Sequence, residues 1–234
     1  MALETFVSPD GEPSRRPGKR SGVIYDKLRK EIMLGIQLPG QPLLELDLAN
    51  RFHCSQSPVR EALLKLKEEG LVVRVANRGT VVSDCSRDDM VELLRLRHSI
   101  ECRGVVRAMK SYNKLVHGTL VTLLQEMEQA ASDDNEYGLS VLDQQFHLRL
   151  YAEANLPSIM PMLERCLVHN HRYKILKTNR SVPLVETAQR HNLILEALLS
   201  GDLDKTVNAM SLHIETIVDF GPSILSANSV QEPD

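Results

Sequence analysis

Apolar residues in the first third of the chain recur at helical spacing before the pattern changes to short extended runs. Val23, Ile24, Leu28, Ile32 and Met33 predict an amphipathic helix that begins near Ser21 and ends at Gly35. After the turn Leu38-Pro39-Gly40, two further helices are expected over 45–52 and 56–69, with Gly70 as the C-cap. Two β-branched runs, 71–75 and 80–82, flank a turn at 77–79 and predict a β-hairpin.

Beyond Ser83 the extended pattern stops and long amphipathic helical patterns follow. They cover residues 87–110, 113–131, 135–154, 157–177, 183–200 and 202–218. Short polar breaks such as Ser132-Asp133-Asp134 separate them, and helices with short connections are typical of a helical bundle.

The two patterns together predict a mainly α fold with two domains. A winged helix-turn-helix is expected at 21–83 and an all-α helical bundle at 87–218. Residues 1–20 are rich in Pro, Gly, Ser and charge, so we expect a disordered arm there, and residues 219–234 are expected to form a flexible tail.

Composition narrows the class of protein. The chain has 42% hydrophobic and 25% charged residues, as in ordinary globular proteins. No apolar run approaches the roughly 18 residues of a membrane span, and the N-terminus lacks the apolar core of a signal peptide. The four cysteines are scattered without a C-x-x-C pair, which argues for reduced thiols and against a disulfide framework or a cysteine-based zinc site. We therefore expect a cytoplasmic protein without a membrane partner.

Charge differs between the two halves of the chain. Residues 1–80 hold 13 Lys and Arg against 10 Asp and Glu, whereas the remainder holds 15 against 21. The mildly basic part is the one with the predicted helix-turn-helix, and this sign suits a phosphate backbone.

Residues 48–72, LANRFHCSQSPVREALLKLKEEGLV, predict a short helix, a polar turn and a second helix that can enter the major groove of DNA. Ser55 can cap this second helix, and Pro58 suits its first turn. Ser55, Gln56 and Ser57 then lie at the helix N-terminus, the end of the helix that contacts phosphate oxygens and base edges of DNA. Leu63, Leu64 and Leu66 are expected to form its buried side.

Arg60 follows one turn later and is the best candidate for a base contact, because arginine binds guanine through two hydrogen bonds. The alternative is a surface charge paired with Glu61 or Glu68. In the hairpin, Arg78-Gly79 can approach the minor groove or a phosphate, although Gly79 is equally suited to be a turn residue only. Basic residues of the arm, Arg15, Arg16, Lys19 and Arg20, can reach DNA or form a solvated tail.

These segments resemble the winged-helix domain of the GntR family of bacterial transcription regulators. The resemblance spans residues 21–82 and is carried by YDKLRKEIMLG, LPG, LELDLANRF, SQSPVREALLKLKEEGLV and RGTVV. It implies a homodimeric or higher-order regulator on palindromic double-stranded operator DNA. The implied DNA-contacting residues are Ser55, Gln56, Ser57, Arg60 and Gly79. The family often has Arg where this chain has Leu46 and Gln56, and Gln prefers adenine, so we expect a half-site that differs at that step.

In the second domain, Asp143 and His147 are four residues apart and share one face of a predicted helix. His191 and His213 lie in the apolar stripes of two later helices. Three imidazoles and one carboxylate suit Zn²⁺, Ni²⁺ or Mn²⁺. A single histidine in such a stripe is more often a hydrogen-bonded core residue, so spacing alone leaves both interpretations open.

The segments DQQFH, HNLILEALLSGD and AMSLHI resemble the FCD ligand-binding domain of the FadR subfamily, over about residues 87–218. This resemblance implies a divalent metal, with Zn²⁺ preferred, bound by Asp143, His147, His191 and His213. Arg190 stands where Glu commonly precedes the third ligand, which affects the surroundings of the site rather than the ligand set.

Arg97, in LLRLRHSIECRG, resembles a family arginine that binds a carboxylate effector beside the metal. The alternative is an internal ion pair with Glu101 at i+4. His169, His171, Arg172 and Tyr173 are further candidates for the lining of the effector pocket.

We therefore expect a metabolite-responsive repressor that a small carboxylate releases from its operator, and not an enzyme. One alternative is a metalloenzyme fused to a DNA-binding module. Two carboxylates near the ligands in sequence, Glu153 and Glu196, suit a solvated face and not a general base. The other alternative is a regulator whose metal is purely structural.

Overall fold

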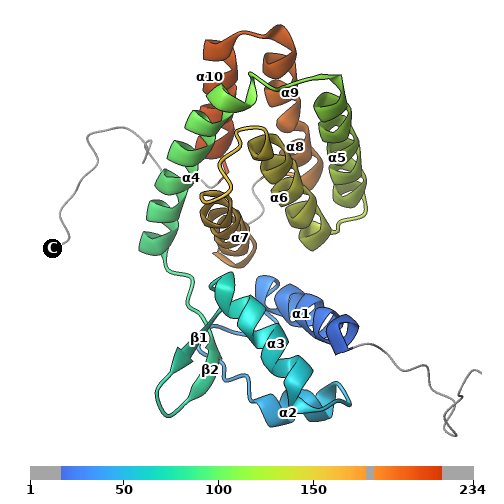
Figure 1. Ribbon diagram of the computed structural model, residues 1–234, viewed down its shortest axis with the longest axis vertical. Coiled ribbons are helices and arrows are strands. Elements are labelled where there is room, and N and C mark those ends of the chain that lie inside the picture. The colour runs from blue at the N-terminus through green and yellow to red at the C-terminus, as the bar shows by residue number, and fades with distance from the viewer. Residues whose placement is uncertain (1–16, 178–181, 218–234) are drawn as a thin grey trace, which may run out of the picture.

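The structure, a computed structural model, describes residues 17–177 and 182–217. The N-terminal part is a winged helix (Figure 1). Its elements are α1 (Pro17–Met33), α2 (Glu45–Arg51), α3 (Gln56–Glu68), β1 (Val72–Val75) and β2 (Gly79–Val82).

The remaining described elements are helical and form a second domain above the first in Figure 1. They are α4 (Arg87–Ala108), α5 (Lys114–Ser132), α6 (Glu136–Ala152), α7 (Met160–Lys177), α8 (Leu184–Gln189), α9 (His191–Ser200) and α10 (Leu203–Glu215). The predicted fold class, mainly α with a winged helix-turn-helix followed by a helical domain, is confirmed. No described helix is long and apolar enough to span a membrane.

The winged-helix core is built from the predicted stripe of α1. Ile24, Leu28 and Ile32 are almost fully buried against α3, as a spacing of four residues requires. Val23 lies outside the stripe and is exposed. In α3, Leu63 and Leu66 are buried but Leu64 is 57% exposed, so its expected place on the buried side was wrong.

The wing is a tight antiparallel hairpin in which Val72 pairs with Val82 and Val75 with Gly79. Gly79 has a φ of +74°, a left-handed conformation that favours glycine over residues with a Cβ. Gly70 is also left-handed, at +76°, and ends α3 as predicted.

Side-chain caps begin several helices of the second domain. Ser86, Asn113, Asn135 and Asp202 each accept a hydrogen bond from a backbone N–H in the first turn of α4, α5, α6 and α10. These caps fix where the helices start, and the apolar stripes of the same helices close one large core around Leu94, Leu120 and Phe146.

Two of the predicted helices differ most from the structure. The first helix begins at Pro17, inside the stretch expected to be an arm, and Arg20 donates to the carbonyl of His53 at 2.8 Å. The helix predicted over 183–200 is divided at Arg190 into α8 and α9. At this break, Nδ1 of His191 donates to the carbonyl of Ala188 at 2.9 Å. This side-chain bond turns the imidazole inward at the first residue of α9.

Candidate metal centre and DNA-reading surface

The structure brings together the side chains of Asp143 and His147 from α6, His191 from α9 and His213 from α10. One potential ligand atom of each lies within 4.8 Å of all the others, and all four residues are buried. Nε2 of His147 is 3.1 Å from Nε2 of His213 and 3.8 Å from Oδ2 of Asp143. Nε2 of His191 is 3.1 Å from Oδ1 of Asp143.

Hydrogen bonds orient two of the imidazoles so that their Nε2 atoms face the cluster. Nδ1 of His147 donates to Oε2 of Glu101 at 2.5 Å, and Nδ1 of His191 donates to a backbone carbonyl. Such bonds fix the tautomer and leave the Nε2 lone pair for a metal. Among the described residues, His191 Nε2 and His213 Nδ1 are buried atoms without a hydrogen bond of good geometry.

The protonation states also suit a cation. Burial lowers the pKa of His147, and burial together with the neighbouring His191 and His147 lowers the pKa of His213 well below its ordinary value. Burial alone would raise the pKa of Asp143, but His171 and His191 hold it well below its usual range. A carboxylate beside three imidazoles is a donor set that fits Zn²⁺, Ni²⁺ or Mn²⁺.

Arg97 lies on α4 beside this cluster and is fully buried. Its Nε donates to Oε1 of Glu101 at 2.5 Å, so the i+4 ion pair considered from the sequence is present. Within the described residues, however, its two terminal nitrogens, Nη1 and Nη2, have no hydrogen-bond partner. Buried N–H groups without acceptors are costly, so this pair of donors is available to an anion.

Glu101 is the functional candidate that sequence reasoning undervalued. It accepts from Arg97 with one oxygen and from His147 with the other. Burial raises its pKa, but Arg97 and His147 lower it more, to about 2. Glu153 instead pairs with Arg149 and Glu196 is exposed, as expected.

The histidines of α7 divide between two locations. His171 donates to Oδ2 of Asp143 at 2.8 Å and so belongs to the cluster. His169 donates to the carbonyl of Glu69, and Arg172 donates to Ser83, both in the winged helix or its exit. The expected pocket lining by these two residues was therefore wrong, because α7 turns them toward the other domain. Tyr173 packs against the helical core.

The residues expected to contact DNA lie at the N-terminal end of α3 and at the turn of the wing. Ser55 and Ser57 are exposed and Gln56 is half-buried. Ser55 is the N-cap residue, but its side chain makes no capping hydrogen bond. The Arg60 side chain is 64% exposed and donates to Glu45 at 2.5 Å and to Gln56 at 3.0 Å, instead of pairing with Glu61 or Glu68. Gly79 is exposed at the wing turn.

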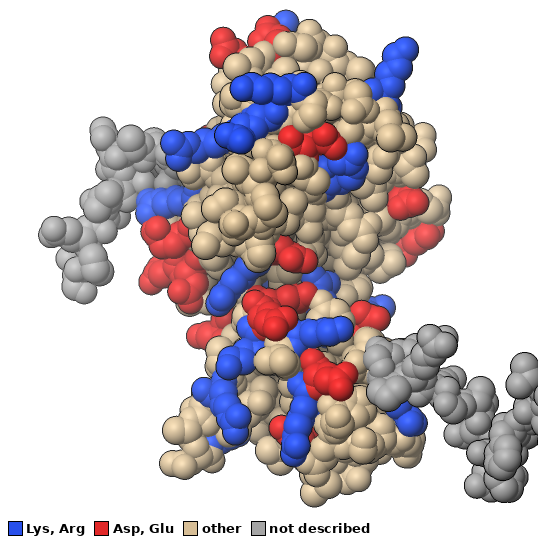
Figure 2. All heavy atoms as spheres, in the orientation of Figure 1, with Lys and Arg blue, Asp and Glu red and all other residues tan. Residues whose placement is uncertain are grey.

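Basic side chains gather over the winged helix on the face in Figure 2, interspersed with acidic ones. Acidic side chains also lie where the two domains meet in this view. Of the four arm residues proposed to reach DNA, only the side chain of Arg20 lies within the described residues, and it contacts His53.

Comparison with protein families matches residues 92–216 to the FCD domain and residues 20–82 to the gntR family of bacterial regulatory proteins. The HTH-type transcriptional repressor RspR of Escherichia coli is 27% identical over 229 residues, covering 98% of this chain and 97% of that protein. A probable D-xylose utilization operon transcriptional repressor of Paenarthrobacter nicotinovorans is 24% identical, covering 82% of this chain and 84% of that protein.

Solved structures show the same fold. E. coli McbR/YncC superposes with a TM-score of 0.69 at 23% identity, covering 83% of this chain and 93% of that one. A putative transcriptional regulator GntR from Rhodococcus sp. RHA1 gives a TM-score of 0.67 at 24% identity, covering 84% and 94%.

Proposed function

The chain belongs to the GntR family of bacterial regulatory proteins, with an FCD domain, and from this membership we propose that it is a metabolite-responsive repressor. In this proposal a dimer, or a dimer of dimers, binds palindromic operator DNA. A small carboxylate that binds beside a divalent metal releases it. Two relatives named as repressors support the direction of regulation.

DNA recognition is assigned to α3 and the wing. Arg60 is exposed one turn into α3 and is the side chain suited to read a guanine, while Ser55, Gln56 and Ser57 offer polar groups at the helix N-terminus. Gly79 allows the wing to approach a sugar or a phosphate closely because it carries no side chain.

Metal binding is assigned to Asp143, His147, His191 and His213, whose donor atoms converge in a buried site. A divalent ion bound there would act as a Lewis acid for a ligand oxygen. The chain's own residues would hold the donor atoms in place. Glu101 and the Ala188 carbonyl fix two imidazoles, and His171 fixes Asp143.

The observation that carries the proposal is the unpaired end of the Arg97 guanidinium. Its two terminal nitrogens are buried without partners among the described residues, while its Nε is held by the same glutamate that orients His147. A carboxylate matches two adjacent guanidinium N–H groups in geometry and charge. A small carboxylic acid is therefore the class of effector that this site favours.

The test is a thermal-shift screen of small carboxylic acids against the full chain, with Zn²⁺ and with a chelator. We expect at least one acid to raise the melting temperature only when metal is present. Arg97→Lys should remove that shift, because lysine keeps the charge but not the two-pronged geometry. Arg95→Lys, at a half-buried arginine of α4 that pairs with Glu92, serves as the matched control and should keep it.

An acid that stabilises the Arg97→Lys variant as strongly as the wild type would contradict the assignment. Loss of stability on chelation, with no acid shifting the melting temperature or the DNA affinity, would favour a purely structural metal. Turnover of an acid by the zinc-loaded protein would favour the metalloenzyme alternative.

A further inference from the structure

Two buried arginines cross the boundary between the winged helix and the helical domain in opposite directions. Arg29 extends from α1 of the winged helix to α6, and Arg172 extends from α7 to the segment that leaves the wing. Arg29 is 7% exposed and Arg172 is fully buried. Each guanidinium donates hydrogen bonds to the opposite domain, so these two side chains tie specific elements together.

Arg29, on α1, contacts both the end of α3 and α6 through three separate nitrogens. Its Nε donates to Glu69 at the end of α3 at 3.0 Å, Nη1 to Tyr137 at 3.2 Å, and Nη2 to Gln144 at 2.9 Å. Tyr25 also donates to Glu69. The end of the DNA-reading helix is therefore fixed to α6 through one side chain.

Arg172 makes a matching connection from α7. Its Nη2 donates to the carbonyl of Ser83 at 2.8 Å and its Nη1 to the hydroxyl of Ser83 at 2.9 Å. Three residues earlier on the same face, His169 donates to the carbonyl of Glu69 at 2.9 Å. Val168 completes this contact by packing into the winged-helix core.

Both connections lead to the same metal-ligand candidate, Asp143. Gln144, which accepts from Arg29, is the next residue of α6. His171, which donates to Asp143 at 2.8 Å, precedes Arg172 on α7. Asp143 is therefore adjacent in sequence to the residue that Arg29 contacts. Its hydrogen-bond partner His171 is adjacent in sequence to Arg172.

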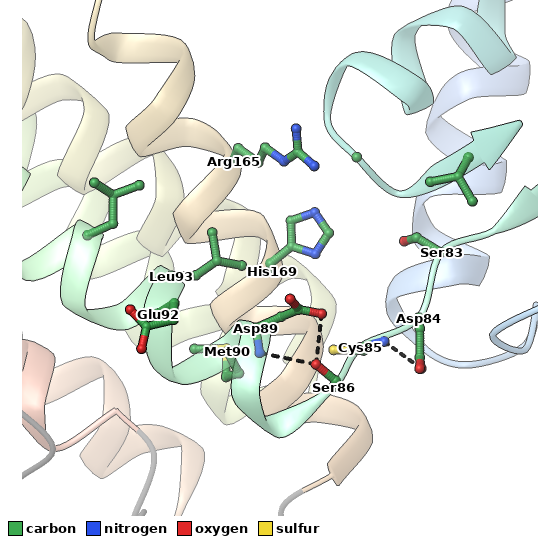
Figure 3. Close-up of a pocket in the computed structure, with 13 residues that line it drawn as sticks. Ser83, Asp84, Cys85, Ser86, Asp89, Met90, Glu92, Leu93, Arg165 and His169 are labelled. Atoms are coloured by element: carbon green, nitrogen blue, oxygen red, sulfur yellow. Dashed lines mark hydrogen bonds between the residues drawn. The ribbon is translucent and has the colours of Figure 1, made fainter. Parts of the chain in front are cut away.

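Open space lies beside the contacts of Arg172 and His169. A cleft of about 490 Å³ lies between the domains, bordered by Gly70 and Val73, by residues 83–86, by α4, and by Arg165 and His169. Figure 3 shows Arg165 and His169 directed from α7 toward the winged helix across this cleft, with Ser83 on the far wall. A few buried contacts beside an open cleft form an arrangement in which one domain can pivot on the other.

We propose that Asp143 communicates the occupancy of the metal centre to the winged helix, with Arg29 and Arg172 as the two coupling residues. The inference rests on the proposed function for the nature of the centre and adds the route of regulation. Binding a cation changes the partners of the Asp143 carboxylate, and α6 and α7 carry that change to the end of α3 and to the exit of the wing. The orientation of the reading helix then depends on the state of the centre.

The test is hydrogen–deuterium exchange of the full chain, with Zn²⁺ as the probe and a chelator as the reference. Bound zinc is counted by elemental analysis in parallel. In the wild type we expect zinc to slow exchange in α6 and α7, and also to change exchange in α1 and at the end of α3. Arg29→Lys and Arg172→Lys keep the buried charge but cannot bind the same set of acceptors.

Each of these two variants should bind as much zinc as the wild type and retain the response of α6 and α7. The response of α1 and α3 should fall by at least half. Arg103→Lys, an exposed arginine on α4, is the matched control and should respond fully. A full winged-helix response in both coupling variants would overturn the inference, as would zinc binding to the wild type without any winged-helix response. Absence of bound zinc would overturn the proposed metal centre, and this inference with it.

Discussion

Glu101 decides which nitrogen of His147 faces the candidate metal ligands. The carboxylate accepts the hydrogen bond from Nδ1 of His147. Arg97 and His147 together lower the pKa of this carboxylate to about 2 and so keep it ionised. The same residue therefore orients a metal ligand and positions the arginine proposed to bind the effector. In the proposed function, this one side chain would make metal and effector binding interdependent.

Replacing Glu101 with Gln is expected to weaken zinc binding by about 10- to 100-fold, the usual effect of removing such a supporting carboxylate. A zinc titration against a competing chromophoric chelator measures this. Glu92→Gln, on an exposed part of the same helix, should bind zinc like the wild type. His147→Ala removes a ligand and should lose more zinc than Glu101→Gln. Full zinc occupancy in His147→Ala would contradict the ligand assignment.

Arg60 is expected to supply specificity but little stability, because its side chain is 64% exposed. Arg60→Ala should abolish binding to DNA selected from a random pool by the wild type, while thermal stability stays unchanged. A gel-shift titration checks this, with Lys67→Ala, an exposed residue of the same helix, as the control. Wild-type affinity in Arg60→Ala would remove Arg60 from the reading surface.

The grouping of the four ligand candidates could be predicted because the family resemblance identifies them, whereas spacing alone left two interpretations open. The partners of those candidates could not. That Glu101 binds His147 and that His171 binds Asp143 depends on how α4 and α7 pack against α6, over separations of 46 and 28 residues. Pairings at such distances follow from tertiary packing and leave no periodic pattern in the sequence.

At the scale of elements, α7 carries two groups of polar residues with different tasks. His171 contacts the ligand cluster, whereas His169 and Arg172 contact the winged helix. A helix places residues three apart on one face and the residues between them on other faces, so this one helix contacts both the ligand candidates and the winged helix. Most helix positions followed from apolar periodicity. The break at Arg190 did not, because it contains neither Gly nor Pro and depends on a hydrogen bond of His191.

The contact of α7 with the winged helix predicts a pH dependence of stability. Burial lowers the pKa of His169 to about 4, whereas the unfolded chain titrates near 6.5. Between these values the unfolded state binds the extra proton, so the free energy of unfolding should fall as the pH falls from about 6.5 to 4.

His169→Gln retains a donor for the Glu69 carbonyl but does not titrate. Its urea-unfolding free energy should therefore decline less steeply over this pH range than that of the wild type. Because His147 and His213 shift in the same direction, the difference between the two proteins is the quantity to compare. Parallel pH profiles for the two proteins would contradict the prediction.

At the scale of the whole molecule, the candidate ligands come from α6, α9 and α10, so a bound ion would cross-link the helical domain. We expect chelation to lower the melting temperature of zinc-loaded protein. With free metal at about 100 times its dissociation constant, the stabilisation amounts to about 2.7 kcal/mol. Differential scanning calorimetry with and without chelator measures the change. Identical melting temperatures in the two conditions would exclude a bound metal that stabilises the fold.

In the free protein, Arg60 already holds two acceptors of its own, Glu45 and Gln56. In the proposed base contact, a guanine would displace these internal partners, and the net gain in binding free energy would be smaller than for an arginine without internal partners. The same internal acceptors are ready to receive the guanidinium when the base is given up. This exchange of partners would lower the barrier to dissociation, and the proposed repressor would have short residence times on DNA and allow a fast return of transcription.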